Sequence, residues 1–156
     1  MQIELDPAVA PPGPPGLRIE RVPMARYAEV QALNEAIFGE RRVIFRLDRA
    51  DLVFLLAWLD GRRVGYKAGY AEDRTTFYSA KGGVLEGYRR RGVARALLYR
   101  MMDEARRLGY RRFAFDTFPN KHAGMTVLGL AEGFAVTAAG YNAAYKDYRL
   151  RFEKAL

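Results

Sequence analysis

The chain has 156 residues, half of them hydrophobic, and its 26 lysines and arginines outnumber its 18 aspartates and glutamates. This length suits a single domain with its own core. The sequence has no cysteine and one histidine, His122, so it excludes disulfides, cysteine nucleophiles and zinc sites made of cysteines or several histidines. We therefore expect no metal. The net charge of +8 favours an anionic partner such as a phosphate-bearing cofactor, a nucleic acid or an acidic substrate, unless it serves solubility alone.

Neither a membrane segment nor a secretory signal is expected. No stretch has the roughly 20 apolar residues that a spanning helix needs, and residues 1–6 lack a basic start and an apolar run. We therefore expect a cytoplasmic protein without membrane contact. Residues 7–16 read PAVAPPGPPG, a composition that starts neither a helix nor a strand. The sequence thus predicts a flexible Pro/Gly-rich segment over residues 1–16 and one domain over residues 17–156.

The first elements of the domain are a strand and a helix. Residues 17–22 alternate apolar and charged side chains, which is typical of a half-buried strand. Apolar residues at helical spacing predict a helix over residues 24–38 that ends at Gly39. The charge-rich segment 40–50 leaves a short second helix open.

Three strands are expected next, over residues 52–59, 63–70 and 75–85. Asp60-Gly61 lies between the first two and is a strong hairpin signal. The second and third strands are joined by a polar turn, and the third is rich in Thr, Tyr, Phe and Val.

The clearest helix follows and ends at Gly109. Its apolar stripe consists of Val93, Leu97, Met101, Ala105 and Leu108. The remaining elements are a strand, a helix and two strands, over residues 111–117, 122–131, 135–140 and 145–152. The resulting order, β-α-(α)-β-β-β-α-β-α-β-β, predicts an α/β fold with a mixed sheet covered by helices.

A turn rich in arginine, Glu86 to Ala94, connects the strand 75–85 to this helix. The start of a helix presents unpaired N–H groups at the positive end of the helix dipole, and such an end binds phosphate. Gly92 lets the backbone approach an anion, Ala94 is small, and four arginines between positions 89 and 95 add charged donors. The turn therefore predicts a phosphate site. The alternative is a solvated loop that caps an ordinary helix.

The pattern Arg89-x-x-Gly92-x-Ala94 after a strand resembles the acyl-CoA-binding motif of the GNAT superfamily of N-acetyltransferases. Val84 and Tyr88 also match the flanks of that motif. The resemblance extends over about residues 17–152 and implies acetyl-CoA as the acyl donor, with its pyrophosphate on backbone N–H groups of the turn. The cofactor-binding residues that it implies are Gly82, Gly83, Val84, Arg89, Arg90, Arg91, Gly92, Val93, Ala94, Arg95 and Asn120.

Within this set, Gly82 to Val84 would pair with the pantetheine arm as an added strand does. Glycines inside a strand suit a close backbone approach, although they also occur at a flexible strand end. The resemblance further implies that the strands 75–85 and 111–117 are parallel neighbours that splay apart. Asn120 either binds the pantetheine or caps the helix that follows.

The chain departs from the family at Gly129, where many members have a tyrosine that protonates the departing thiolate. Glycine cannot donate this proton, so another group donates it, water does, or the chemistry is lost. Tyr141 and Tyr145 are the nearest substitutes in the sequence.

The reaction implied by the resemblance is direct attack of a primary amine, from a small molecule or a peptide, on the thioester. An alkyl ammonium has a pKa of about 10, so a base must remove a proton. Glu86 and Asp116 are the first candidates, followed by Glu35 and Glu40, although each also suits a surface role. A backbone N–H near Gly83 is the candidate donor to the oxyanion.

Two other functions remain open. The glycine at position 129 favours an acyl-CoA-binding sensor without catalysis. Arginine pairs along the chain suit a nucleic-acid-binding module, but they are scattered over several elements and no stacking motif of an RNA-binding sheet accompanies them. We also expect a homodimer, with the aromatic C-terminal strands as its surface.

Overall fold

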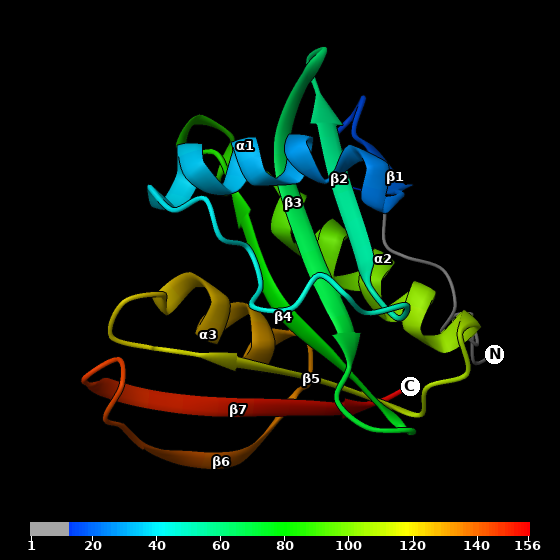
Figure 1. The fold of residues 1–156 in the computed structure, drawn as a ribbon. Helices are drawn as coiled ribbons and strands as arrows, with labels where there is room; N and C mark the ends of the chain where they lie inside the picture. The colour runs from blue at the N-terminus through cyan, green and yellow to red at the C-terminus, as the bar shows by residue number, and fades with distance from the viewer. Residues whose placement is uncertain (1–12) are drawn as a thin grey trace, which may run out of the picture.

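A computed structural model describes residues 13–156, which form one sheet with helices on both faces (Figure 1). The strands are β1 (Arg18–Val22), β2 (Val53–Leu59), β3 (Arg62–Ala71), β4 (Thr76–Val84), β5 (Arg112–Thr117), β6 (Ala135–Asn142) and β7 (Asp147–Ala155). The helices are α1 (Tyr27–Phe38), α2 (Val93–Arg107) and α3 (Ala123–Ala131), with short 3-10 turns η1 (Met24–Arg26) and η2 (Glu86–Tyr88). These elements confirm the predicted order apart from the optional helix.

The strand order is β1-β2-β3-β4-β5-β7-β6, and the only parallel pair in the described sheet is β4 with β5. Helix α2 connects these two strands, as a crossover between parallel strands requires. The mixed sheet covered by helices confirms the predicted fold class.

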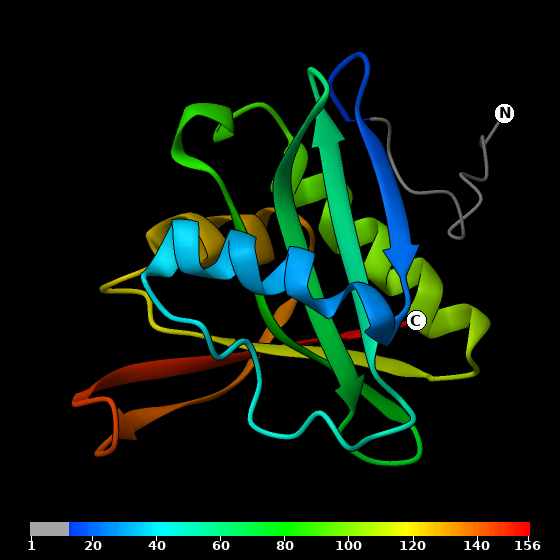
Figure 2. The same cartoon turned by 45° about the horizontal axis from the view of Figure 1, so that its top comes forward.

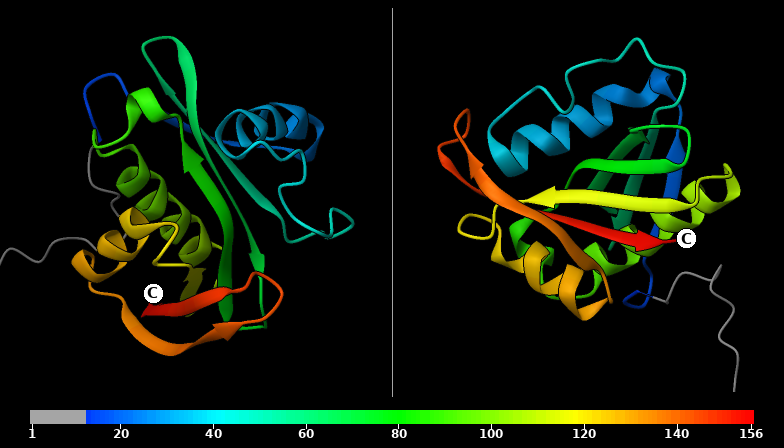
Figure 3. Two further views of the ribbon diagram at one scale, coloured as in Figure 1. Left: turned by 90° about the vertical axis from the view of Figure 1, so that its left-hand side faces the viewer. Right: turned by 90° about the horizontal axis from the view of Figure 1, so that it is seen from below.

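Two hydrophobic layers hold the helices on the sheet. On one face, Val30 and Leu33 of α1 pack in a cluster with Phe54. On the other face, Met101 of α2 packs in a cluster with Phe113, and α3 covers the same face (Figure 2; Figure 3). The central strands are therefore buried on both sides.

Strands β4 and β5 diverge halfway along their length. They pair only from Thr76 to Ser79 of β4 and from Arg112 to Phe115 of β5. Beyond Ser79, β4 continues to Val84 paired with β3 alone, while β5 stays paired with β7. The predicted splay between these strands is confirmed, and it leaves a fork in the middle of the sheet (Figure 3).

The segment 40–50 is a loop, so the optional second helix is wrong. Asn34 of α1 is fully buried, and its amide donates to the carbonyl oxygens of Glu40 and Arg42. The Tyr66 hydroxyl donates to the Asn34 side-chain oxygen at 2.6 Å. These bonds take the loop carbonyls that a helix would use internally, and they hold the loop against α1.

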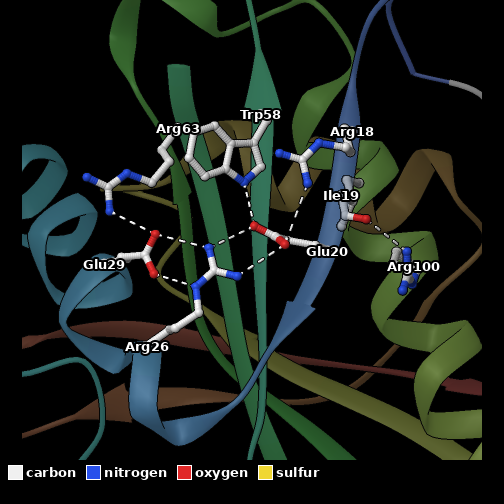
Figure 4. Close-up of polar contacts among 8 residues, drawn as sticks. All are labelled: Arg18, Ile19, Glu20, Arg26, Glu29, Trp58, Arg63 and Arg100. Atoms are coloured by element: carbon white, nitrogen blue, oxygen red, sulfur yellow. Dashed lines mark hydrogen bonds and ion pairs between the residues drawn. The ribbon is translucent and has the colours of Figure 1, made fainter. Parts of the chain in front are cut away.

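A cluster of charged residues, which we call the Arg26 cluster, ties β1 to α1 and β2. The Arg26 guanidinium donates hydrogen bonds to the carboxylate of Glu20 and to the carboxylate of Glu29. The Trp58 indole N–H donates to Glu20 at 2.8 Å, and Arg63 lies 3.3 Å from Glu29 (Figure 4). Every charged group of this cluster has a protein partner.

The described chain begins with a turn against α2. The Leu17 N–H donates to the Pro14 carbonyl at 3.1 Å, and the Pro14 ring lies 4.0 Å from where a Cβ on Gly92 would be. Most of the flexible segment predicted for residues 1–16 lies outside the described residues. Within residues 13–156, no helix is long and apolar enough to cross a bilayer.

Candidate functional site

The turn before α2 has an unusual backbone. Arg90 has a φ of 62° and Gly92 a φ of 85°, so both adopt the left-handed conformation that glycine tolerates and arginine seldom adopts. The Arg89 Nε donates to the Val84 carbonyl at 3.1 Å, which ties the turn to the end of β4. This bond fixes the conformation of the turn relative to β4.

Six consecutive N–H groups at this turn have no acceptor among the described residues. Gly92 is the N-cap of α2, and no side chain caps the helix. The Arg89 N–H donates to Glu86 and the Ala96 N–H to Gly92, while none of the amides from position 90 to position 95 is bonded. Unpaired donors at the positive end of a helix dipole suit an anion, so this geometry fits the phosphate site that we predict from the sequence.

The arginines of the turn divide into two kinds. Arg90 makes no ion pair or hydrogen bond with the described chain, and Arg91 has only Asp60 at 3.8 Å, with both side chains more than half exposed. Arg89 is bound to Val84, and Arg95 pairs with Glu132. Arg90 and Arg91 are therefore the cations free to meet an anion.

The glycine pair in β4 lies in tight surroundings. A Cβ on Gly83 would lie 3.0 Å from the Phe38 ring, and a Cβ on Gly82 would lie 3.0 Å from the Tyr66 carbonyl. Both glycines pair in register with β3. The alternative of a flexible strand end is therefore wrong, and the glycines are needed because their neighbours approach so closely.

A cavity of about 210 Å³ lies beside the fork, between β5 and the C-terminal hairpin. It brings together Asp116 and Tyr141, two of the predicted catalytic residues, with Arg149 and Arg151 at its wall. One Asp116 oxygen accepts from the Tyr78 hydroxyl at 2.7 Å, and the other is buried without a partner in the described chain. Burial, and then the bond to Asp116, raise the pKa of Tyr78, so this hydroxyl stays protonated and acts as a donor.

The sequence matches the acetyltransferase (GNAT) family over residues 20–126, more than half of the chain. The chain belongs to this family. The match confirms the resemblance drawn from the turn residues and the class of reaction, acetyl transfer. Among curated proteins, none matches the sequence.

Solved GNAT structures share the fold at low identity. An IAA acetyltransferase from Bacillus cereus aligns with a TM-score of 0.77 and 18% identity, over 90% of this chain and 99% of that one. A GNAT acetyltransferase from Elizabethkingia anophelis with acetyl-CoA bound has a TM-score of 0.74 and 16% identity, over 91% and 99%. The ribosomal-protein-S18-alanine N-acetyltransferase of Escherichia coli has a TM-score of 0.75 and 12% identity, over 89% and 93%. At these identities the likeness extends to the fold alone.

Three of the carboxylates predicted as candidate bases lie outside the cavity. Glu86 is exposed in η2 and does not line the cavity. Glu40 pairs with Lys81 at 2.8 Å and Glu35 lies 3.9 Å from Arg41. Of the carboxylates named from the sequence, the cavity contains only Asp116.

Asn120 is not the cap of α3. The N-cap is His122, and the Asn120 amide donates to Asp147 at 3.1 Å. The capping alternative is therefore wrong. The Asn120 side chain instead links the loop after β5 to the C-terminal hairpin, and Tyr145 packs on Phe118 in the same region.

The position of the missing GNAT tyrosine has no room for a side chain. A Cβ on Gly129 would lie 2.9 Å from the Phe115 ring and 3.1 Å from Phe152. Two large rings thus occupy the space in front of α3. Neither Tyr141 nor Tyr145 enters it, because both are more than half exposed.

The sequence analysis missed two residues near the fork, Tyr78 and Lys67. Tyr78 holds Asp116, and Lys67 is a buried cation on β3, 6% exposed. The signal for Lys67 was a lone charge inside the apolar run of that strand. Residues 13–156 contain no group of three or more His, Asp or Glu side chains arranged to hold a metal.

Proposed function

We propose that the chain transfers the acetyl group of acetyl-CoA to a primary amine of a small molecule or a peptide. The amine attacks the thioester directly, without an acetylated protein intermediate. The observation that carries this proposal is the row of six unbonded N–H groups from position 90 to position 95. They offer the pyrophosphate a set of preorganised donors beside two free arginines.

The fork and its two sides support the placement of the donor. The pyrophosphate would lie at the turn, with Val93, Ala94 and Arg95 contributing backbone N–H groups. The pantetheine would run along β4 at Gly82 to Val84, where β5 no longer pairs with that strand. In this arrangement acetyl-CoA is the acyl donor.

The amine would enter from the cavity beside Asp116. The unpartnered carboxylate oxygen suits either binding the ammonium or accepting its proton. Tyr78 orients the carboxylate, and Tyr141 lines the same cavity. Asp116 is therefore the base we favour over Glu86, and Tyr141 is a residue for acceptor contacts.

We also propose a cytoplasmic homodimer. Strand β6 is the last strand of the sheet, and residues 135–141 are exposed, including Val136 at 45% and Tyr141 at 60%. An exposed edge with apolar side chains invites pairing with a second copy. Light scattering after size exclusion would measure the mass, and a monomer at micromolar concentration would contradict the dimer.

The function is tested by calorimetric titration with acetyl-CoA, followed by thiol release over a panel of amines. Gly92→Asp places a like charge against the pyrophosphate, and such contacts cost several kcal/mol, so affinity should fall at least about a hundredfold. A Cβ at position 92 meets nothing closer than the Pro14 ring at 4.0 Å, so the added Cβ itself creates no clash.

The matched control is Gly92→Ala, which has the same backbone strain and the same added Cβ without the charge. It should lose far less affinity than Gly92→Asp. Equal affinity of the wild type and the aspartate variant would refute the assigned phosphate site.

The glycine at position 129 favours one second function, an acyl-CoA sensor without catalysis. Acetyl-CoA binding without thiol release from any amine would support it. Sequence-independent binding of polynucleotide that weakens steeply with salt would instead support the nucleic-acid alternative.

A further inference from the structure

Lys67 is the one buried lysine of the described sheet that the proposed mechanism has not used. It lies on β3 opposite Gly82 of β4, and it is 6% exposed. Its ammonium makes no hydrogen bond or ion pair with any described residue. Among the described residues, the buried side-chain atoms without a partner are oxygens of Asp103 and Asp116, so the Lys67 ammonium keeps some access to solvent at the end of a buried stem. A cation in such surroundings is available to a ligand or a reaction.

The stem of the Lys67 side chain lies against Gly82 of β4. Its Cγ lies 3.2 Å from where a Cβ on Gly82 would be, so the missing side chain of that glycine makes room for the lysine stem. Neighbouring strands are about 4.8 Å apart, and an extended lysine is longer than that. From this position an extended side chain is long enough to bring the ammonium to the part of β4 that no longer pairs with β5, where we place the pantetheine.

Lys67 lies on the face of the sheet that α2 covers, and no charged side chain there influences its pKa. Leu55 of β2 pairs with it in register, and Leu55 belongs to the hydrophobic cluster of this face together with Leu97 of α2 and Phe115 of β5. The two buried carboxylates of α2, Asp103 and Glu104, are each paired with arginines. Burial alone lowers the pKa of Lys67 to about 8, so the group can give up a proton near neutral pH.

We propose that Lys67 is the catalytic acid that protonates the thiolate of coenzyme A as it departs. The inference rests on the proposed function and names a further catalytic residue for it. The lysine would supply the proton that a tyrosine at position 129 supplies in many GNAT proteins. The Phe115 and Phe152 rings leave that position no room for a side chain.

The proton balance of the step is simple. The neutral amine attacks the thioester carbon and forms the C–N bond, and the C–S bond then breaks with its electron pair on sulfur. Lys67 transfers one proton to that sulfur and becomes a neutral amine. The proton lost by the acceptor nitrogen passes through Asp116 or water to solvent, and Lys67 is reprotonated from solvent. The proton given to solvent and the proton taken back by Lys67 cancel, so the net products from the neutral amine are the amide and the free thiol; an acceptor that starts as the ammonium releases one proton in addition.

A lysine with a lowered pKa suits this step because an acid is most effective when its pKa lies near the operating pH and near that of the group it protonates. A cysteine-like thiol has a pKa of about 8.5. The wild-type kcat should therefore fall as the pH rises through about 8, since Lys67 then loses its proton before the step.

The test compares Lys67→Met and Lys67→Arg with the wild type. Both variants should retain the KM for acetyl-CoA within about twofold and lose at least about tenfold in kcat, within the range for general acid catalysis. The alkaline fall of kcat should vanish in both. Lys67→Met should melt at no lower a temperature than the wild type, because methionine fills the space of the buried stem and removes a charge that burial disfavours, so misfolding cannot explain the loss.

Lys154→Met is the matched control. This lysine of β7 is half-buried and lies opposite Phe113 of β5, and its ammonium is already bonded, to the Glu132 carbonyl at 2.7 Å. Its kcat should stay at the wild-type value. A wild-type kcat in Lys67→Met would overturn the acid role, because the lysine would then have no part in the step. A raised KM with kcat intact would mean that Lys67 only binds the substrate. Full rescue by arginine would mean that only the positive charge matters.

A second measurement needs no acceptor. The thiolate absorbance of bound coenzyme A, followed against pH, gives the pKa of its sulfur. A nearby ammonium stabilises the thiolate, so this pKa should be lower in the wild type than in Lys67→Met. Equal values with intact binding would refute the position of Lys67, whereas absence of binding in the wild type would refute the proposed function itself.

Discussion

The Arg26 cluster and the turn before α2 are both rich in arginine, but their surroundings are opposite. In the cluster, Arg26 bonds two carboxylates, and one of these also accepts from the Trp58 indole (Figure 4). In the turn, Arg90 has no partner in the described chain and the backbone around it adds unbonded N–H groups. Both regions concentrate arginines, and they differ in how many acceptors the chain offers to them.

Because of this difference, we expect the Arg26 cluster to contribute to stability and the turn to contribute to binding. A guanidinium whose donors are all used within the chain fastens one element to another, here β1 to α1. Donors that the fold leaves free, while the backbone beneath them is fixed by the Arg89 bond to Val84, are available to a ligand. The same reasoning applies to Asp116, which has one buried oxygen without a partner, and to Lys67, a buried side chain that makes no bond with the described chain.

The largest effect is expected at the unsatisfied carboxylate. Asp116→Asn keeps the shape and the bond from Tyr78 but removes the base, so kcat should fall about a hundredfold. Acetyl-CoA affinity should be unchanged by titration calorimetry. A kcat within about twofold of the wild type would exclude Asp116 as the base and return the choice to Glu86.

A smaller effect should separate the two arginine groups. Arg90→Ala with Arg91→Ala should weaken acetyl-CoA binding about ten- to hundredfold, because each removes a charged hydrogen bond to phosphate, and should leave the melting temperature nearly unchanged.

Arg26→Ala should show the reverse, with a lower melting temperature and the wild-type affinity. If Arg26→Ala weakened binding as strongly as the double variant, the division between the two regions would be wrong.

The smallest effect concerns acid stability. The bond to Arg26 is the main cause that lowers the pKa of Glu20 and Glu29 below their ordinary value of 4.5. Their contribution to stability is therefore complete above pH 4.5 and is lost as the pH falls through the lowered values. The melting temperatures of the wild type and Arg26→Ala should converge below about pH 4.5, and a constant difference would contradict this linkage.

The turn could be predicted because its signals are local. A strand, a glycine at the helix start and adjacent arginines lie within a dozen residues, and the six free N–H groups follow from that order. Asp116 and Tyr141 were named separately, through the family resemblance. Their meeting in one cavity could not be predicted, because strands distant in sequence bring these residues together.

Lys67 and Asn34 could not be found in this way. Strand β3 is buried on both faces, so its apolar residues show no alternation that would reveal where a lysine points. The direction of Lys67 depends on a register with β4 that includes a bulge at Ala68/Gly69. Asn34 looked like one more position of an amphipathic helix, and its partners are carbonyl oxygens that no residue pattern encodes.

The fork between β4 and β5 gives the sheet an edge in its interior. At this edge the backbone of β4 beyond Ser79 does not pair with β5, so the sheet is incomplete there. A donor lying there would act as the missing strand and complete the sheet. Because a ligand that binds only the folded state raises the melting temperature with its concentration, heat resistance would report how well each acyl-CoA fills the gap.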